Sequence, residues 1–177
     1  MRKLRMEELE RLSVEEFRQS AKTPVALVLD NVRSGLNVGS AFRTADAFAL
    51  EHVYLCGITA TPPHREILKT ALGSTETVAW SHHTDLPALV TQLKNEGYQV
   101  LAVEQVDQSI PLSDFRMEPD TRYALIFGNE VDGVSSAVLP HCNNCLEIPQ
   151  AGTKHSINVA VCVGIVCWEL FKQYKWK

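Results

Sequence analysis

Residues 146–170, LEIPQAGTKHSINVAVCVGIVCWEL, decide the fold that this chain is expected to adopt. They begin as a short strand at 146–148 and continue through a glycine-containing loop at 150–155. From 156 to 168 no residue is charged, so the helix predicted there has no polar face to turn toward water. We therefore expect this helix to be buried on every side, with the rest of the chain packed around it.

Two polar residues, Ser156 and Asn158, stand in the first turn of this otherwise apolar helix. The N-terminus of a helix has free backbone N–H groups, so a loop and two polar side chains beside it can form a ligand site. The alternative is that Ser156 only caps the helix and Asn158 completes the bend. The stretch by itself leaves both interpretations open.

The length and composition are those of a single soluble globular domain. The chain has 177 residues, of which 45% are hydrophobic and 21% charged. No run reaches the ~18 apolar residues that span a membrane, and the N-terminus is too charged for a secretory signal. We therefore expect a cytoplasmic protein that does not bind a membrane.

The cysteines favour the same compartment and no metal centre. There are five, an odd number, as expected where disulfides are not formed. Cys142 and Cys145 have the spacing of a redox or zinc pair, but no second pair completes a metal site. We expect both to be structural residues and the protein to need no metal.

The net charge of −4 argues against binding of nucleic acid by overall charge. A local basic surface is still allowed, because several basic residues lie in predicted loops or at predicted helix ends. They are Arg33, Arg43, Arg65, Lys69 and Lys154. Composition does not decide whether they form a surface for RNA or separate solvated charges.

Predicted strands alternate with predicted helices, which indicates an α/β fold with a mainly parallel sheet flanked by helices. The strands are expected at 25–29, 52–56, 76–80, 99–104, 123–127 and 146–148. The helices are expected at 37–48, 65–71, 84–96 and 135–141, besides the C-terminal one. Residues 1–22, with a capping box at Ser13 and Glu16, form a helical extension before the domain at 23–177.

The loops at one edge of the predicted sheet are the expected binding site, because parallel sheets bind ligands beyond the carboxyl ends of their strands. Three loops there hold most of the unusual polar residues: 30–37, 128–133 and 149–156. The sequence has no glycine-rich nucleotide loop, no nucleophile elbow and no His-Glu-x-x-His zinc motif. A dinucleotide-binding enzyme and a P-loop kinase are therefore disfavoured.

Three ordered stretches resemble motifs of one family, the SpoU branch of the SPOUT RNA methyltransferases. Residues 31–48 resemble its first motif, N-x-G-x-x-x-R-T-A-x-x-F-G, through Asn37, Gly39, Arg43, Thr44, Ala45 and Phe48, with Ala49 in the last place. The second motif is matched at 127–135 by Gly128, Glu130 and Gly133. The third, I-P-x-x-G-x-x-x-S-L-N-V, is matched at 148–159, with Ile157 in place of leucine.

This resemblance implies the SPOUT fold, in which the C-terminal segment threads through a loop and forms a deep trefoil knot. It also implies a homodimer that binds S-adenosyl-L-methionine and methylates the ribose 2′-hydroxyl of structured RNA. The residues expected to bind the cofactor are Val103, Gly128, Ile148, Ser156 and Ile157, of which no motif fixes the first.

The catalytic residues that the resemblance implies are Arg43, Asn37, Glu130 and Asn158. The family's arginine is thought to help deprotonate the 2′-hydroxyl, with the first asparagine orienting it. Because the pKa of arginine is about 12.5–13.8, its neutral form is scarce near pH 7. We therefore expect Arg43 to clamp the neighbouring phosphate and stabilise the developing alkoxide, and the alternative is an ion pair with Asp46.

Residues 97–115 resemble the tRNA D-loop guanosine methyltransferases of the family, so tRNA is the expected substrate. The short extension at 1–22 weakens this expectation, because bacterial enzymes of that kind carry longer ones. A 23S rRNA is the main alternative, and a tRNA wobble position comes after it. A non-catalytic RNA-binding member of the family is the alternative of another class, and absence of cofactor binding would identify it.

Overall fold

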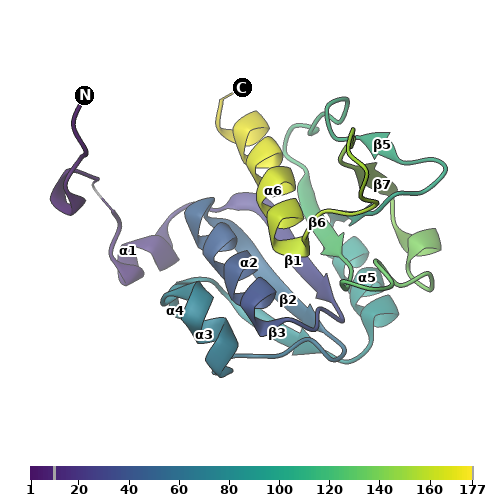
Figure 1. The fold of residues 1–177 in the computed structure, drawn as a ribbon, viewed down its shortest axis with the longest axis horizontal. Coiled ribbons are helices and arrows are strands. Elements are labelled where there is room, and N and C mark those ends of the chain that lie inside the picture. Colours follow the sequence, from purple (N-terminus) through teal and green to yellow (C-terminus); the bar gives the residue numbers. More distant parts are fainter. Residues whose placement is uncertain (10, 177) are drawn as a thin grey trace.

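A seven-stranded sheet forms the centre of the computed structural model, which describes residues 1–9 and 11–176 (Figure 1). The strands lie in the order β3-β2-β1-β6-β4-β7-β5, and every neighbouring pair is parallel. Their bounds are β1 Thr23–Asp30, β2 Leu50–Cys56, β3 Trp80–His83, β4 Tyr98–Val103, β5 Ile110–Pro111, β6 Arg122–Phe127 and β7 Asn144–Glu147. The predicted α/β class with a mainly parallel sheet is confirmed.

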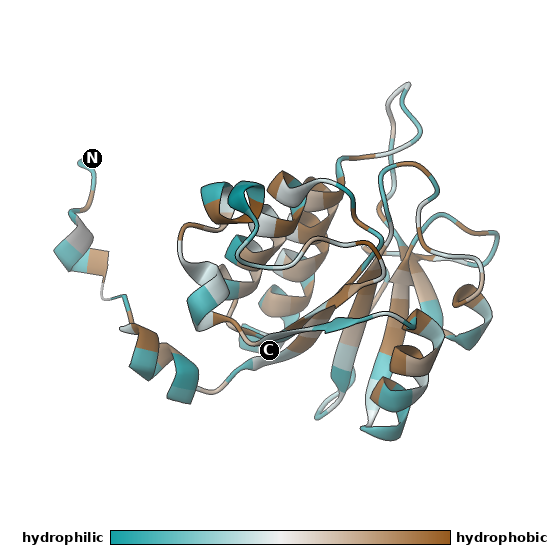
Figure 2. Ribbon diagram, turned by 90° about the horizontal axis from the view of Figure 1, so that it is seen from below, coloured by the Kyte–Doolittle hydropathy of each residue, from teal (hydrophilic) through white to brown (hydrophobic). Residues whose placement is uncertain are grey.

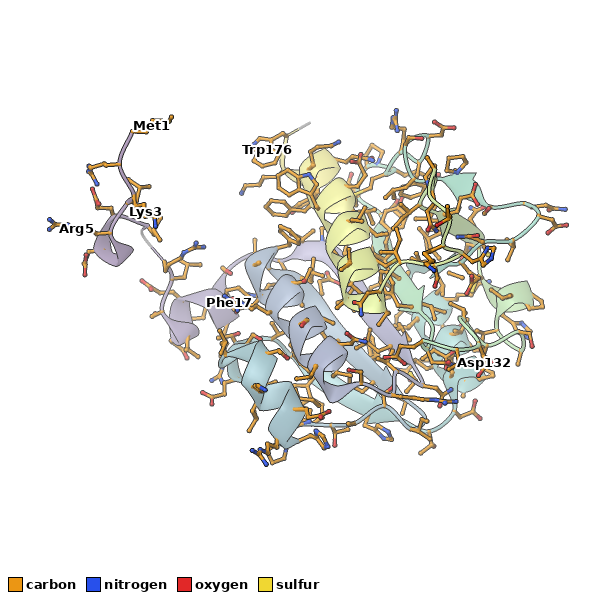
Figure 3. The ribbon with its side chains drawn as sticks, in the orientation of Figure 1. Met1, Lys3, Arg5, Phe17, Asp132 and Trp176 are labelled. Carbon is orange, nitrogen blue, oxygen red and sulfur yellow. The ribbon has the colours of Figure 1, made fainter. Side chains whose placement is uncertain are left out.

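Helices lie on both faces of this sheet (Figure 2), and a cluster of buried hydrophobic side chains packs on each face. On β1, Leu27 and Leu29 pack toward α2 and α6, whereas Ala26 and Val28 pack toward α5. A strand buried on both faces reads as an unbroken apolar run, which is why β1 was visible in the sequence. The helices are α1 Val14–Gln19, α2 Gly35–Ala47, α3 Arg65–Ala71, α4 Ser74–Thr77, α5 Leu86–Asn95 and α6 Val159–Lys175, with 3-10 turns η1 Met6–Leu9 and η2 Leu139–His141.

The N-terminal extension consists of two short helical pieces that lead away from the sheet (Figure 1). The predicted capping box is present, because the Ser13 hydroxyl accepts from the Glu16 N–H and the Glu16 carboxylate accepts from the Ser13 N–H. Two contacts anchor α1 to the domain. Phe17 is buried, and the Arg18 guanidinium donates to the Glu76 carbonyl oxygen over 2.7 Å.

The predicted strand at 76–80 is wrong, and a helical turn stands in part of its place. Ser74–Thr77 form α4, and β3 begins only at Trp80. Threonine and valine in this segment favour a strand by intrinsic preference, but tertiary contacts override such preferences. Here the Thr77 hydroxyl donates to the Asp46 carboxylate of α2 over 2.5 Å, which holds the turn against that helix.

The predicted helix at 135–141 is also wrong over most of its length, since only η2 is helical. Pro140 has no backbone N–H to donate, and in a helix interior its ring clashes with the carbonyl four residues before it. A proline is therefore tolerated only in the first turn of a helix, where Pro140 lies in η2. The chain therefore reaches η2 through turns rather than through a full helix.

The expectation that the C-terminal helix is buried on every side is wrong for the single chain. Val163, Val166 and Leu170 of α6 are fully buried, but Val161 is 52% exposed and Trp168 is 45% exposed. The reason is that α6 packs with one side on α2, the sheet and the segment around Phe115, and the described residues leave its other side uncovered (Figure 1). Among the described residues, no helix is long and apolar enough to cross a membrane.

Candidate active site

A pocket of about 580 Å³ lies at the carboxyl ends of β4, β6 and β7. Two of the three predicted loops, 128–133 and 149–156, contribute to its wall, and the third reaches it through hydrogen bonds. The structure places every residue expected to bind a cofactor in the lining. They are Val103, Gly128, Ile148, Ser156 and Ile157.

Three of the four predicted catalytic residues form one hydrogen-bonded chain beside this pocket. The Asn37 Nδ2 donates to Glu130 Oε1 over 2.8 Å, and the Asn158 Nδ2 donates to Asn37 Oδ1 over 3.3 Å. These residues are far apart in sequence, so the chain joins α2, the loop after β6 and the start of α6. The three loops therefore meet, as predicted.

The Glu130 carboxylate is held in its ionised form. Burial raises the pKa of this group, but donated hydrogen bonds from the Asn37 side chain and from the backbone N–H groups of Arg33 and Ser34 outweigh burial. The net pKa is therefore below the usual value of glutamate. A charged carboxylate at this position fixes the orientation of the Asn37 amide, whose oxygen then faces Asn158.

Arg43, the fourth predicted catalytic residue, is not part of this chain. It is exposed on α2 and lines a separate groove of about 480 Å³ between α2, α3 and α6. Arg43 lies six positions after Asn37 on α2. This offset corresponds to about 9 Å along the helix axis and a net rotation of roughly 240° around it, so the two side chains leave different sides of the helix. The alternative ion pair with Asp46 is absent from the described contacts, because that carboxylate accepts from Thr77 instead.

Asn158, and not Ser156, caps α6. Its Oδ1 accepts from the backbone N–H groups of Ala160 and Val161 over 2.9 and 3.3 Å. Because its Nδ2 donates to Asn37 at the same time, one side chain both caps the helix and joins the polar chain. Ser156 lies before the helix, exposed in the pocket wall, so the simple capping alternative for that residue is wrong.

Glu104 is a residue of the pocket that the sequence did not single out. Its carboxylate accepts from the backbone N–H groups of Val134 and Gln105, each over 2.9 Å. The Gln105 side chain then donates to the His155 carbonyl oxygen over 3.2 Å. Glu104 and Gln105 therefore tie the end of β4 to both neighbouring loops. The position of Glu104 at the carboxyl end of a predicted strand was the signal that could have revealed it.

The glycines of the second motif allow the loop after β6 to fold back on itself. A side chain at Gly128 would put its Cβ 1.8 Å from the carbonyl carbon of Gly133, where no atom fits. Gly133 has a φ of +69°, in the left-handed region that favours glycine. The two residues bring Asn129 and Gly133 into an antiparallel bridge, which closes the loop beside the pocket.

The charge of the pocket is negative. Its lining includes four carboxylates and, among the described residues, no lysine or arginine. The carboxylates belong to Glu104, Glu130, Asp132 and Glu147. Such a wall attracts a cationic ligand and repels the phosphates of a nucleotide.

Cys142 and Cys145 lie away from this pocket, packed against the cluster around α5. Burial raises the pKa of Cys142 to about 11, so its thiol stays protonated and unreactive near neutral pH. The part of the chain that the structure describes contains no group of three His, Cys, Asp or Glu side chains that could hold a metal ion.

Comparison with known proteins gives relatives with the same fold. The 23S rRNA (guanosine-2'-O-)-methyltransferase RlmB of Neisseria meningitidis serogroup B is 31% identical over 86% of this chain and 60% of its own length. An AdoMet-bound rRNA methyltransferase from Sinorhizobium meliloti is 26% identical and superposes with a TM-score of 0.78 over 87% of this chain and 59% of its own. A TrmH/SpoU tRNA modifying enzyme of A. aeolicus, 23% identical, superposes with a TM-score of 0.81 over 92% of this chain and 81% of its own.

The family is decided by a match to most of the chain, although the curated relatives are longer proteins. This chain spans about 53% and 60% of the length of two of them. The model of the SpoU rRNA Methylase family matches residues 24–168, which include all three motifs and every residue of the pocket wall. The chain belongs to the SpoU rRNA Methylase family.

Proposed function

We propose that this protein is an S-adenosyl-L-methionine-dependent RNA methyltransferase that modifies a ribose 2′-hydroxyl, in tRNA at the D-loop guanosine. The observation that carries this proposal is the polar chain of Glu130, Asn37 and Asn158 at the wall of an acidic pocket. Family membership and the relative named as a guanosine-2'-O-methyltransferase support the reaction.

The pocket suits this cofactor in charge and in polarity. S-adenosyl-L-methionine is a sulfonium cation, and when bound it supplies an activated methyl group. Four carboxylates in the wall favour a cation, and Val103, Ile148 and Ile157 offer apolar surface for its adenosine part. Gly128 and Ser156 complete the proposed binding set. The rRNA methyltransferase from Sinorhizobium meliloti named above is described with AdoMet bound, which supports the assignment.

The proposed roles of the polar chain follow from its hydrogen bonds. Methyl transfer requires alignment of the ribose oxygen and stabilisation of the charge that develops on it. Glu130 holds the Asn37 amide, and Asn37 holds Asn158, so the three form a fixed polar wall against which a ribose can be oriented. No metal is required for these tasks.

Arg43 is proposed to act where two copies of the chain meet. Beside its groove, α6 presents an uncovered apolar surface that includes Val161, Ile165 and Trp168. Contiguous exposed apolar surface of this kind marks an interaction site, and a second copy of the chain would bury it. In such a homodimer, Arg43 of one copy clamps the phosphate of RNA whose ribose lies at the pocket of the other copy.

A deep trefoil knot is proposed for the C-terminal part. The strand order supports it, because β7 lies between β4 and β5 although these two follow each other in the chain. The segment at 104–121 therefore passes outside β7. Gln173 of α6 forms two hydrogen bonds with this segment. Its Nε2 donates to the Phe115 carbonyl oxygen, and its Oε1 accepts from the Met117 N–H.

The proposed RNA is tRNA, on the resemblance of residues 97–115, and the main alternative is 23S rRNA. The relative from Neisseria meningitidis supports the alternative, because its name gives that RNA. We also propose that residues 1–22 are an extension and 23–177 the methyltransferase domain, in line with a family match that begins at residue 24. Five free cysteines are in line with a cytoplasmic protein.

Two measurements test this proposal. Calorimetric titration should show binding of S-adenosyl-L-methionine, and mapping of 2′-O-methylation in total RNA should show one guanosine in tRNA that loses its methyl group when the gene is deleted. A changed site in 23S rRNA would select the alternative substrate. No cofactor binding at millimolar concentration together with no changed site would select a non-catalytic RNA-binding member of the family.

A further inference from the structure

The groove that contains Arg43 has the chemistry of an anion site. Arg43 and Lys69 bring two cations to its wall from α2 and α3, and no carboxylate lines it among the described residues. Lys69 is exposed, and neither cation forms an ion pair in the part of the chain that the structure describes. The two cations therefore give this groove a local positive charge in a protein whose net charge is −4.

Two hydroxyl groups of this groove have no proton left to donate to a ligand. The Ser40 and Thr70 hydroxyls each donate to the Leu36 carbonyl oxygen over 2.9 Å, so their protons are already in use. The side-chain donors left free in the groove are therefore chiefly those of the two cations. A phosphodiester accepts hydrogen bonds, donates none and carries one negative charge, so it can accept from both Arg43 and Lys69.

The position of the groove indicates the phosphates of a chain rather than a small free anion. Asn37 of the polar chain lies on α2, and Ser40 and Arg43 follow three and six residues later. Six residues correspond to about 9 Å along the helix, which is less than two turns. A nucleic acid strand carries a phosphate at every nucleotide, so a strand whose ribose lies at either pocket of the proposed homodimer has further phosphates that can reach this groove.

We propose that the groove between α2, α3 and α6 binds the phosphodiester backbone of the substrate RNA, and that Lys69 is its second cation beside Arg43. This inference rests on the proposed function in taking RNA as the substrate. It adds a contact residue outside the three motifs and outside the pocket. Of the five basic residues singled out in the sequence, it assigns these two to one surface, whereas Arg33 lies within 3.9 Å of Asp132.

Lys69→Ala tests this surface without touching the proposed catalytic residues. Equilibrium binding of an unmodified tRNA transcript should weaken, and the slope of log affinity against log salt should fall by about 1. The gap to the wild type should therefore widen by roughly threefold between about 200 and about 50 mM salt. Lys69→Arg should bind as the wild type does. In turnover assays, KM for RNA should rise while kcat stays the same.

Lys94→Ala is the matched control. Lys94 also stands in the last turn of a helix, but α5 is on the other face of the sheet. It should leave RNA affinity and the salt slope unchanged. Unchanged RNA binding and salt slope in Lys69→Ala would overturn the inference, while binding of S-adenosyl-L-methionine and turnover would leave the proposed function standing. Conversely, Lys69-dependent RNA binding without cofactor binding would keep this surface and reject the enzyme.

Discussion

Glu130 is the single residue that links the most parts of the site, since it accepts from the Asn37 side chain and from two backbone N–H groups of the loop before α2. The sequence motif indicated this glutamate, but only the fold shows what it holds. The same is true of Glu104, which no motif indicated and which fixes the loop that ends at Val134. Contacts between loops depend on the order of the strands in the sheet, and a sequence motif does not reveal that order.

The link made by Glu130 should depend on pH. Because its pKa is lowered in the folded protein, its stabilising effect is complete above the ordinary glutamate pKa of about 4.3 and is lost as the pH falls through the lowered value. We expect the amide NMR signals of Arg33 and Ser34 to move with a midpoint below the ordinary value. Glu130→Gln should abolish this titration. A midpoint at or above the ordinary value would contradict the described hydrogen bonds.

Glu104 should help the pocket to distinguish the charged cofactor from its uncharged product. Glu104→Gln keeps an oxygen that can accept from Val134 but removes one of the four negative charges. The affinity for S-adenosyl-L-methionine should fall roughly three- to tenfold, while that for S-adenosyl-L-homocysteine, which lacks the sulfonium charge, should hardly change. Calorimetry with both ligands measures this ratio, and Glu76→Gln on α4 is the control. Equal losses for both ligands would speak for a purely structural role.

At the scale of elements, the bounds of α3 were predicted correctly, whereas the strand at 76–80 and the helix at 135–141 were not. Local patterns succeed where an element is bounded by its own caps. They fail where a contact from another element decides, as at the hydrogen bond between Thr77 and Asp46. The start of α6 is another such failure, because the sequence suggested Ser156 as the cap, whereas Asn158 caps the helix and bonds to Asn37.

The double role of Asn158 can be separated by substitution. Asn158→Ala removes the cap and should lower the free energy of unfolding by roughly 1 kcal/mol, whereas Asn158→Ser keeps a good cap and should cost much less. Both variants lose the donor to Asn37, so both should lose most methyl transfer. Chemical denaturation and transfer of a labelled methyl group to RNA measure the two effects. A fully active serine variant would remove Asn158 from the proposed catalytic set.

At the scale of the whole molecule, the predicted sheet class is confirmed but the burial of α6 is not. The charge-free helix was expected to be buried on every side, and a single copy of the chain leaves Val161 and Trp168 uncovered. An apolar residue in a sequence does not reveal whether its neighbour belongs to the same chain or to another. Arg43 is the corresponding case in the site, because the family resemblance placed it with Asn37, whereas in a single copy it lines a separate groove.

A mixing experiment tests whether the site is shared between two copies. Arg43→Ala and Glu130→Ala should each be inactive alone. If the arginine acts on the pocket of the partner, random exchange of subunits should restore about one quarter of wild-type activity, since half of the dimers then hold one intact site. Sedimentation velocity on the wild type should show a dimer. If the subunits are shown to exchange and the mixture still has no activity, Arg43 and Glu130 must act together within one copy.

The position of β7 has a consequence for the synthesis of the protein. The pocket wall includes residues from β7 and the first turn of α6, which leave the ribosome after the other six strands. β7 lies between β4 and β5, which were made earlier, so it is inserted between neighbours rather than added at a free edge. A nascent or truncated chain can form much of the sheet and still lack one wall of the pocket. Ligand binding in the cell is thereby restricted to chains whose synthesis has passed the first turn of α6.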